Sequence, residues 1–321
     1  MPNVIPSVIN DDLAFAGARV AIAAAIASQR EVGRGDEKQA DQAAVDAMRT
    51  ALNKMAIKGR IVIGEGERDE APMLYIGEEV GTGAGPEIDI ALDPLEGTTL
   101  TAKAMANALA VIAFAPRGGM LHAPDTYMDK LAIGPGYGDG VVDLDAPAGE
   151  NAKALAKAKG VAVADVGVCV LDRPRHQAII ESLRGAGARV HLISDGDVAG
   201  VINTTDPETG VDMYVGQGGA PEGVLAAAAL KCVGGQFQAR LVFRNDDEKA
   251  RAERIGVSDF KRRYVRDELV STDAVFVATG VTNGSLLSGV KISRGFIHTH
   301  TLVMNSATRN VCELRVKTPV K

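Results

Sequence analysis

Two short runs of apolar and β-branched residues end abruptly in acidic segments, and this feature constrains the fold most. The run from Arg60 to Ile63 opens into the acidic, glycine-rich segment from Gly64 to Glu67. The run from Ile88 to Leu92, apolar except for Asp89, leads directly into the segment from Asp93 to Gly97. Short apolar runs bounded by Gly or Pro are typical of buried strands. The sequence therefore predicts at least two strands whose ends deliver clusters of carboxylates.

Helical patterns alternate with further strand patterns along the chain. Helices are expected where an acidic or Pro cap precedes apolar residues spaced three or four apart. The expected helices cover residues 11–30, 37–55, 148–159, 175–183 and 197–202, a segment that begins at Pro72, and an alanine-rich stretch that Gly216 to Gly223 opens. Further strands are expected at residues 108–115, 130–133, 166–171, 190–193 and 211–215, the first two of them in the same sheet as the strands above. This alternation predicts an α/β fold.

The length of 321 residues corresponds to two domains or one large one. Between Gly134 and Gly160 the composition shifts toward Gly, Pro, Ala and Asp, as is typical of a domain boundary. We therefore expect an N-terminal α/β subdomain over residues 1–150 and a C-terminal α/β subdomain over residues 151–321.

Composition and charge exclude several classes of protein. Hydrophobic residues make up 46% of the chain and charged residues 24%, so a folded globular protein is expected rather than a disordered one. The formal net charge is −6, so no overall positive field attracts nucleic acid or an anionic membrane, and neither is expected as a partner. An anionic substrate then requires a local basic pocket or a bound metal.

The cysteines and the N-terminal pattern predict a cytoplasmic protein. Cys169, Cys232 and Cys312 are far apart, odd in number and without metal-ligand spacing, so they are expected to be reduced structural thiols. The most apolar N-terminal run, Val20 to Ala27, is too short for a membrane span and follows acidic rather than basic residues.

Three separated segments place carboxylates at a strand end or a helix start. They contain Glu65 with Glu67 and Asp69, Asp93 with Glu96, and Glu222. Mg²⁺ and Mn²⁺ prefer such oxygen ligands and keep their other positions for water and phosphate oxygens. For any one of these acids, and for Glu65 in particular, a solvated loop charge is an alternative explanation.

The acidic segment at the end of the second strand combines several features of a metal and phosphate site. Asp93 and Glu96 lie three apart across a Pro-containing turn, so both can reach one ion while the carbonyl of Leu95 points between them. Gly97 permits a tight turn, and Thr98 opens a helix whose free N–H groups can face a phosphate. The alternative is a plain tight turn followed by a Thr cap.

At these residues the sequence resembles a known family. The segment from Asp93 to Thr98 is similar to the metal-binding signature of the lithium-sensitive, metal-dependent sugar and inositol phosphatases. More closely, the chain resembles class II fructose-1,6-bisphosphatase, the GlpX type. The motifs that carry this resemblance are Gly33 to Asp36, Ile63 to Glu67, Arg68 to Tyr75, Asp195 to Asp197 and Gly218 to Gly223. They occur in the family's order and span nearly the whole chain, which makes the resemblance specific.

The resemblance implies a set of metal ligands and catalytic groups. The implied ligands of Mg²⁺ or Mn²⁺ are Asp41, Glu65, Asp93, Glu96 and Glu222, with the carbonyl of Leu95 as a further ligand. Thr98 is implied to orient or help deprotonate the attacking water, and Glu67 and Asp69 are second candidates for an acid–base or outer-shell role. Asp41 is explained equally well by the helix dipole, since it stands in the first turns of a helix.

The resemblance also implies where the sugar phosphate binds. The implied substrate site consists of Gly97, Thr98, Tyr127, Lys130, Arg173, Arg175, His176, Asp195, Asp197 and Gly219. A guanidinium group suits a phosphate because its planar donors can bind two oxygens at once. For Arg173 and Arg175, exposed charges beside a helix start are the alternative, although a basic pair there opposes the helix dipole.

The fold implied by the resemblance is the layered α-β-α-β-α architecture of the sugar phosphatases, with two α/β subdomains. The implied activity is hydrolysis of the C1 phosphate of fructose 1,6-bisphosphate by metal-activated water, a step of gluconeogenesis or the Calvin cycle. The alternatives are sedoheptulose 1,7-bisphosphate as substrate, alone or as well, an inositol monophosphatase, and a sugar-phosphate sensor without turnover. A homodimer or homotetramer is expected. One departure is that relatives often carry Lys directly after Gly-Asp, whereas Glu37 stands there and Lys38 follows.

Overall fold

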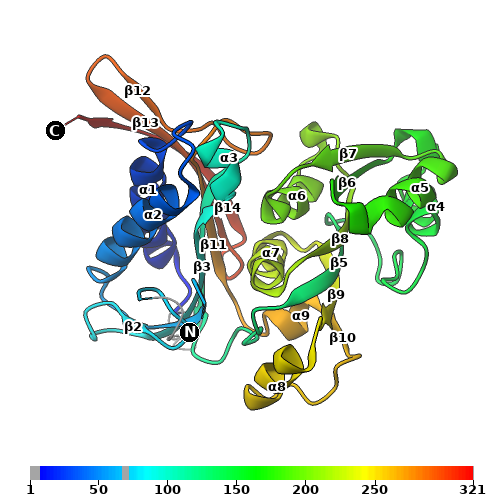
Figure 1. The fold of residues 1–321 in the computed structure, drawn as a ribbon, viewed down its shortest axis with the longest axis horizontal. Helices are drawn as coiled ribbons and strands as arrows, with labels where there is room; N and C mark the ends of the chain where they lie inside the picture. The colour runs from blue at the N-terminus through cyan, green and yellow to red at the C-terminus, as the bar shows by residue number, and fades with distance from the viewer. Residues whose placement is uncertain (1–7, 67–71, 321) are drawn as a thin grey trace, which may run out of the picture. The chain divides into compact units, whose positions relative to one another are not determined.

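The computed structural model describes residues 8–66 and 72–320 (Figure 1). Contacts divide the chain into two compact units. The first comprises Met1–Leu121 with Val270–Lys321, and the second comprises His122–Leu269. Each unit has its own sheet, and the two are described in turn.

The first unit contains an eight-stranded sheet in the described residues. Its strands are β1 (Lys58–Ile63), β2 (Glu79–Val80), β3 (Glu87–Glu96), β4 (Leu109–Pro116), β11 (Val275–Gly280), β12 (Lys291–Ser293), β13 (Phe296–Asn305) and β14 (Asn310–Pro319). Its helices are α1 (Asp11–Gln29), α2 (Glu37–Leu52) and α3 (Thr98–Ala102). The strand order is β12-β13-β11-β4-β3-β1-β2, with β14 paired to β13. β1 and β3 are parallel, whereas β4 and β11 join the sheet antiparallel.

Helix α1 packs on this sheet and closes the first core. The side chain of Asn10 caps α1 by accepting a backbone N–H three residues later at 2.9 Å, and Asp36 caps α2 in the same way at 3.0 Å. Gly17 of α1 lets the ring of Phe114 come close, since a Cβ there would lie 2.5 Å from a ring carbon. Burial of the alanine-rich face of α1 against the strands removes apolar surface from water, which is the main stabilising contribution.

The second unit contains a six-stranded sheet in the described residues. Its strands are β5 (Tyr127–Ile133), β6 (Gly167–Leu171), β7 (Arg189–Ile193), β8 (Met213–Gly219), β9 (Gln236–Val242) and β10 (Arg263–Val265), in the order β10-β9-β5-β8-β6-β7. Its helices are α4 (Ala148–Lys159), α5 (Gln177–Ala186), α6 (Asp197–Ile202), α7 (Ala220–Val233), α8 (Asp246–Arg254) and α9 (Arg266–Leu269), with 3₁₀ turns at Val163–Asp165, Pro174–His176, Asn203–Thr205 and Pro207–Thr209. β6 is parallel to β7 and β8.

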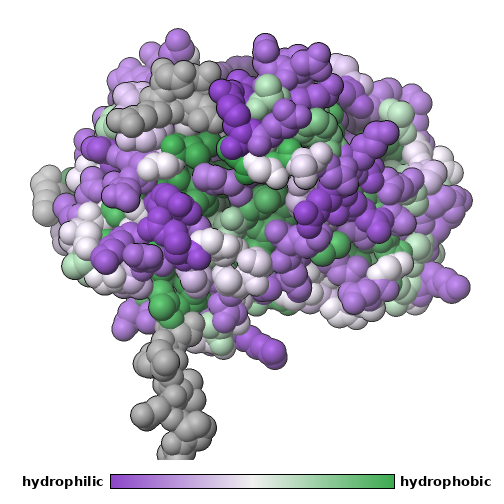
Figure 2. Space-filling view, turned by 90° about the horizontal axis from the view of Figure 1, so that it is seen from below, coloured by the Kyte–Doolittle hydropathy of each residue, from purple (hydrophilic) through white to green (hydrophobic). Residues whose placement is uncertain are grey.

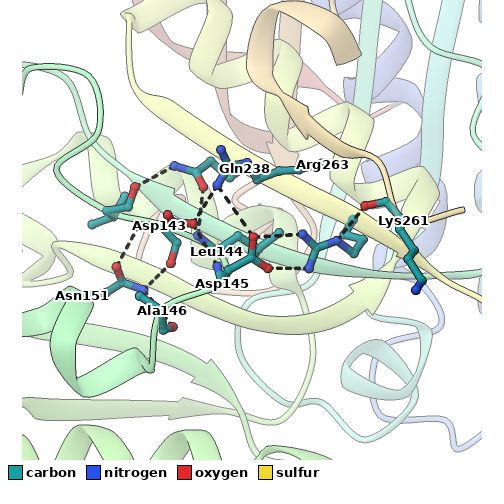
Figure 3. A network of polar contacts seen from close by, with 10 residues as sticks. Asp143, Leu144, Asp145, Ala146, Asn151, Gln238, Lys261 and Arg263 are labelled. Atoms are coloured by element: carbon teal, nitrogen blue, oxygen red, sulfur yellow. Dashed lines mark hydrogen bonds and ion pairs between the residues drawn. The ribbon is translucent and has the colours of Figure 1, made fainter. Parts of the chain in front are cut away.

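A polar network fastens the loop before α4 to this second sheet (Figure 3). Asp145 accepts two hydrogen bonds from the guanidinium group of Arg240, at 2.6 and 3.1 Å. Gln238 of β9 holds the backbone of the loop, accepting from the N–H of Leu144 at 2.9 Å and donating to the carbonyl of Val142 at 2.7 Å. The segment whose composition resembles a domain boundary therefore packs within the second unit.

The α/β class predicted from the alternation of strands and helices is confirmed. The expectation that residues 130–133 join the first sheet is wrong, because β5 pairs with β8 and β9 of the second sheet. The units also divide the chain differently from the boundary expected at residue 150, since β11 to β14, from the end of the chain, complete the first unit. Pairing between strands that are distant in sequence leaves no local pattern to read.

The prediction of a helix from Pro72 is wrong. Residues 72–78 form turns in the described chain, and Leu74 has a φ of 53°, outside the helical range. The backbone of Leu74 bonds elsewhere: its carbonyl accepts from the N–H of Glu65 at 3.0 Å, and its N–H donates to the buried carboxylate of Glu78. These tertiary hydrogen bonds replace the local helical ones.

None of the helices in the described ranges combines the length and the apolar composition that crossing a membrane requires. On the face shown in Figure 2, hydrophilic residues surround smaller apolar areas. Cys169, Cys232 and Cys312 all carry free thiols, as their odd number and wide separation predict.

Candidate functional site

Two neighbouring parallel strands bring acidic residues to one edge of the first sheet. β1 and β3 run in the same direction, and Ile63 of β1 is level with Ala91 of β3. Glu65 and Asp93 each follow two residues later. The carboxyl ends of parallel strands meet at one edge of a sheet, and α/β proteins bind ligands there. Glu65 and Asp93 therefore lie at the same end of the two strands, Glu65 just beyond β1 and Asp93 near the end of β3.

The side chain of Glu65 is hydrogen-bonded to that of Asp41, which extends from α2. Burial and the adjacent Asp41 carboxylate raise the pKa of Glu65 to about 8. Burial also raises the pKa of Asp41, against the opposing effect of its hydrogen bond with Glu65. Two half-buried carboxyl groups in contact must share a proton or a cation, so Asp41 has an interaction that the helix dipole does not explain. Glu37 and Lys38, where the resemblance implies a departure from the family pattern, are both exposed.

The acidic end of β3 is an irregular strand end rather than a free loop. The pairing of β3 with β4 shifts between Asp93 and Glu96, and Asp93 Oδ1 accepts the N–H of Leu95 at 3.0 Å. Glu96 is buried, with 4% of its surface exposed. Gly97 then has a φ of 90°, in the left-handed region, as the predicted tight turn requires. Thr98 begins α3 as expected, although this helix has only five residues.

The donor chemistry of this edge suits a hard divalent cation, because carboxylate and carbonyl oxygens are the ligands that Mg²⁺ and Mn²⁺ prefer. Within the described ranges, no three or more His, Cys, Asp or Glu side chains are already gathered closely enough to hold a metal ion. Glu67 and Asp69, which were also predicted here, lie outside the described residues. The metal ligands therefore stay a prediction.

In the second unit, Lys130 of β5 forms a buried ion pair with Asp197 at the start of α6. Lys130 Nζ lies 2.5 Å from Asp197 Oδ2, and the Lys130 side chain is fully buried. The hydroxyl of Tyr214, from β8, donates to the same carboxylate oxygen at 3.4 Å. A buried charge is costly unless it is paired, so these groups stabilise one another. The structure thus brings together two residues of the predicted substrate site.

Glu222 lies half-buried in the first turn of α7, within the electrostatic reach of this ion pair. Burial raises the pKa of Glu222, and the positive charge of Lys130 opposes that shift. Glu222 Oε2 is buried and has no hydrogen-bond partner among the residues that the structure describes. An orphaned carboxylate oxygen of this kind suits a cation or a donor on a ligand. Glu222 belongs to the second unit, whereas the other predicted metal ligands belong to the first.

Two glycines at the end of β8 permit this close packing. A Cβ at Gly218 would lie 2.0 Å from Asp197 Oδ2, and a Cβ at Gly219 would lie 2.0 Å from Glu222 Oε2. A larger residue at either position would displace a carboxylate. The predicted glycine-rich segment is therefore the end of a strand that lets side chains approach the backbone.

The ring of Tyr127 stacks with two guanidinium groups. Arg175 Cζ lies 5.0 Å from the ring centroid, and Arg244 Cζ lies 4.9 Å from it. Arg175 Nη2 also donates to the carbonyl of Gln217 at 2.8 Å, and Arg244 forms an ion pair with Glu248. Tyr127 and Arg175 were predicted substrate residues, whereas the sequence did not point to Arg244. Arg244 lies just before the acidic start of α8, and nothing in the sequence except its charge marked it as a site residue.

The imidazole of His176 is held by main-chain groups on both sides. His176 Nδ1 lies 2.7 Å from the carbonyl of Leu171, and the N–H of Gln217 donates to His176 Nε2 at 2.8 Å. An accepting Nε2 and a donating Nδ1 require the neutral ring, and burial accordingly lowers the pKa of His176. Both ring nitrogens are thereby engaged, so the geometry assigns His176 to fixing β8 rather than to contacting substrate directly.

Arg173 and Asp195 leave the second sheet at one edge. Leu171 of β6 is level with Ile193 of the parallel strand β7, and Arg173 and Asp195 each follow two residues later. This repeats the arrangement of Glu65 and Asp93 in the first sheet. The two predicted substrate residues are therefore at the ligand-binding edge of their sheet.

Comparisons with known proteins cover nearly the whole chain. The family model described as bacterial fructose-1,6-bisphosphatase, glpX-encoded, matches residues 11–317. The chain is 44% identical over 313 residues to fructose-1,6-bisphosphatase 1 class 2 of Escherichia coli strain K12, covering 94% of this chain and 93% of the relative. The same identity and coverage hold for fructose-1,6-bisphosphatase class 2 of Escherichia coli O6:H1 and of Shigella flexneri.

Proposed function

Since the chain belongs to the family of glpX-encoded bacterial fructose-1,6-bisphosphatases, we propose that it hydrolyses fructose 1,6-bisphosphate to fructose 6-phosphate and inorganic phosphate. The observation that carries this proposal is similarity over 94% of the chain and 93% of a class 2 enzyme. The protein is accordingly a phosphoric monoester hydrolase. We propose that the phosphoryl group at C1 is transferred to water and that the C1 oxygen of the sugar is the leaving group.

The proposed ligands of Mg²⁺ or Mn²⁺ are carboxylate and carbonyl oxygens. They belong to Asp41, Glu65, Asp93, Leu95 and Glu96, and also to Glu222. The contact between Glu65 and Asp41 and the orphaned oxygen of Glu222 support this assignment, because each leaves half-buried negative charge that a cation would balance. When bound, the ions would neutralise phosphate charge and lower the pKa of a water molecule.

The chain's own residues bind and orient the substrate. Arg173 and Arg175 offer planar donors for phosphate oxygens, and stacking on Tyr127 holds Arg175 in place. The Asp197 carboxylate, fixed by Lys130, can accept a hydrogen bond from a sugar hydroxyl.

Residues near the phosphate complete the proposed site. Thr98 orients the attacking water, with Glu67 and Asp69 proposed for the acid–base role. Gly97 and Gly219 allow the backbone to approach the substrate closely, and Asp195 lies at the same sheet edge as the arginines. We also propose that the protein functions in the cytoplasm, which its free thiols support.

Phosphate release tests the proposal directly. Purified protein is incubated with fructose 1,6-bisphosphate and Mn²⁺ or Mg²⁺, and a parallel sample contains EDTA. We expect phosphate release with metal and none with EDTA. Sedoheptulose 1,7-bisphosphate and an inositol monophosphate are assayed beside it, so faster release from either would replace the proposed substrate. Substrate binding without any release would leave a sensor instead.

Two variants on one helix test the metal ligands. Asp41 and Asp46 both lie on α2, but Asp41 contacts Glu65 whereas Asp46 is exposed and accepts a local hydrogen bond from Gln42. We expect Asp41→Asn to raise the Mn²⁺ concentration needed for half-maximal activity at least about tenfold, while Asp46→Asn leaves it unchanged. Equal metal requirements in the two variants would remove Asp41 from the ligand set.

A further inference from the structure

β14 is the outer strand of the first sheet and presents a free backbone edge. It pairs with β13 over its whole length, and with no other strand in the described part of the chain. The N–H of Val320 donates to the carbonyl of Gly295 at 2.9 Å, so even-numbered residues here direct their backbone groups toward β13. Odd-numbered residues of β14 therefore direct theirs away from the sheet. Pro319, which lacks an N–H, stands at an odd position, as an edge strand allows.

The edge is long, exposed and partly apolar. Val311 of β14 is 52% exposed, and Val316 is 37% exposed. Val320, directly after β14, is 46% exposed, so three of the eleven exposed large apolar side chains in the described residues lie within residues 311–320. Long exposed strand edges with apolar side chains are templates for pairing with another chain.

We propose that β14 is an interface between two copies of this chain. The two β14 strands pair antiparallel around a two-fold axis, so that the sheets of the first unit form one continuous sheet across the copies. In such a pair, residues directly opposite one another point to the same face. The two-fold axis therefore passes between one residue of β14 and the same residue of the second copy, which lies directly opposite it. The outward N–H and C=O groups of Val311, Glu313, Arg315 and Lys317 then bond to the same groups of the second copy.

The charges on β14 select one register. When Leu314 lies opposite Leu314 of the second copy, Glu313 of each copy faces Arg315 of the other, and Val311 faces Lys317. Centring the pair on residue 313 would set Glu313 against itself, and centring it on residue 315 would set Arg315 against itself. Opposite charges directly across an antiparallel pair stabilise it, and like charges destabilise it. Only the register centred on Leu314 avoids a like-charge pair at its centre while forming two ion pairs.

The other face of the strand agrees with this register. Leu314 faces Leu314 of the second copy, and Cys312 faces Val316. Cys312 and Leu314 already pack against the core of the first unit. Pairing would therefore extend that core from one copy to the other and cover Val316, which solvent now reaches.

Charge exchange tests the interface. The mass of the full chain is measured by sedimentation or light scattering over a dilution series, and we expect an assembly that contains the dimer. Arg315→Glu and Glu313→Arg each replace the two ion pairs across the interface with two pairs of like charges. Each variant should therefore raise the dissociation constant of the dimer at least about tenfold. The double variant Glu313→Arg with Arg315→Glu restores both ion pairs and should restore the dissociation constant. Circular dichroism of every variant confirms that it folds.

Cysteine cross-linking tests the register. In the background Cys312→Ala, Leu314→Cys places two thiols directly opposite, about 4.5 Å apart at Cα, within reach of a disulfide. Mild oxidation by oxidised glutathione should then yield a covalent dimer. The matched control, Val316→Cys in the same background, has no thiol opposite it and should remain uncross-linked.

Two results would overturn the proposal. One is a chain that remains monomeric at a concentration of about 10 µM. The charged residues of β14 would then be explained as groups that prevent the edge from pairing. The other is an assembly whose dissociation constant does not respond to Arg315→Glu, which would place its interface elsewhere. The inference does not depend on the proposed activity, because its readouts are mass and covalent cross-linking.

Discussion

Replacing Lys130 with Met removes the cation of the buried ion pair while keeping a side chain of similar length. Lys130 is fully buried and the Asp197 side chain is 7% exposed, so the abandoned carboxylate cannot regain water without opening the structure. Glu222 would lose the same nearby positive charge, which now opposes the rise in its pKa that burial causes. Removing one partner of a buried ion pair costs about 3–5 kcal/mol, and we expect a loss in this range.

An exposed ion pair in the same unit provides the matched control. Lys153 Nζ of α4 lies 2.8 Å from Glu150 Oε1, a distance similar to that of the buried pair. These side chains are 51% and 61% exposed, however, so water replaces the interaction when it is lost. Such exposed helix pairs contribute about 0.3–0.5 kcal/mol. Lys153→Met should therefore leave stability almost unchanged.

Thermal and urea unfolding in EDTA measure both variants without a contribution from bound metal. For a unit the size of His122–Leu269, 1 kcal/mol shifts the melting temperature by roughly 3 °C, so the second unit of Lys130→Met should melt about 9–15 °C lower. The transition of the second unit is used, since the two units need not unfold together. If Lys130→Met and Lys153→Met differ by less than about 1 kcal/mol, the buried ion pair does not have the stabilising role assigned to it.

Three further predictions concern stability. A Cβ at Gly167 would lie 1.9 Å from a backbone oxygen, so Gly167→Ala should lower the free energy of unfolding in urea by more than about 3 kcal/mol. The matched control is Gly185→Ala in α5, where the new Cβ meets nothing within 4 Å. This variant should raise the free energy of unfolding by about 0.5–1 kcal/mol. Burial lowers the pKa of His176 below its usual 6.5, so the folded state binds fewer protons than the unfolded state. The stability that the neutral His176 contributes is therefore present above pH 6.5 and is lost as the pH falls further. Urea midpoints between pH 7 and 5 measure this loss, which His176→Asn should abolish. Burial acts to raise the pKa of Glu248, but hydrogen bonds from the backbone and guanidinium group of Arg244 outweigh it and lower the pKa from 4.5 to about 2. Stability from Glu248 is therefore present above pH 4.5 and lost toward pH 2, and acid unfolding of Glu248→Gln should lack that component.

Elements with strong local patterns could be predicted from sequence. Val45, Met48 and Leu52 recur at helical spacing, and all three are buried in α2. Helix α4 begins and ends at the residues that its Pro start and Gly end indicate. Local spacing and caps suffice where the helix makes its own hydrogen bonds.

Elements that depend on distant partners could not be predicted. Lys130 lies in a strand, as expected, but nothing near it indicates that its neighbours are β8 and β9. Leu74 follows a good helix start, yet its backbone bonds to Glu65 and Glu78. In both cases the deciding interaction joins segments that local patterns treat separately.

The site shows the same division at the level of single residues. The family resemblance marked Asp41 and His176, but it did not say what they touch: Asp41 meets Glu65, and His176 is fixed by main-chain groups. Arg244 had neither a motif nor a spacing to mark it, and only the stacking on Tyr127 shows its place. The role of a polar side chain depends on its partners, which spacing does not record.

The ends of parallel strands provide more information than either single residues or local periods. In both sheets, two parallel strands are in register, and the polar residues two positions beyond a level pair lie at the same end of the strands: Glu65 with Asp93, and Arg173 with Asp195. The four apolar runs before them were visible in the sequence. Aligning the ends of such runs, under the assumption that they are parallel neighbours, would have paired Arg173 with Asp195, and Glu65 with the residue directly after Asp93, without any coordinates. The limiting information is therefore which strands are neighbours, and not the chemistry of the residues that they position.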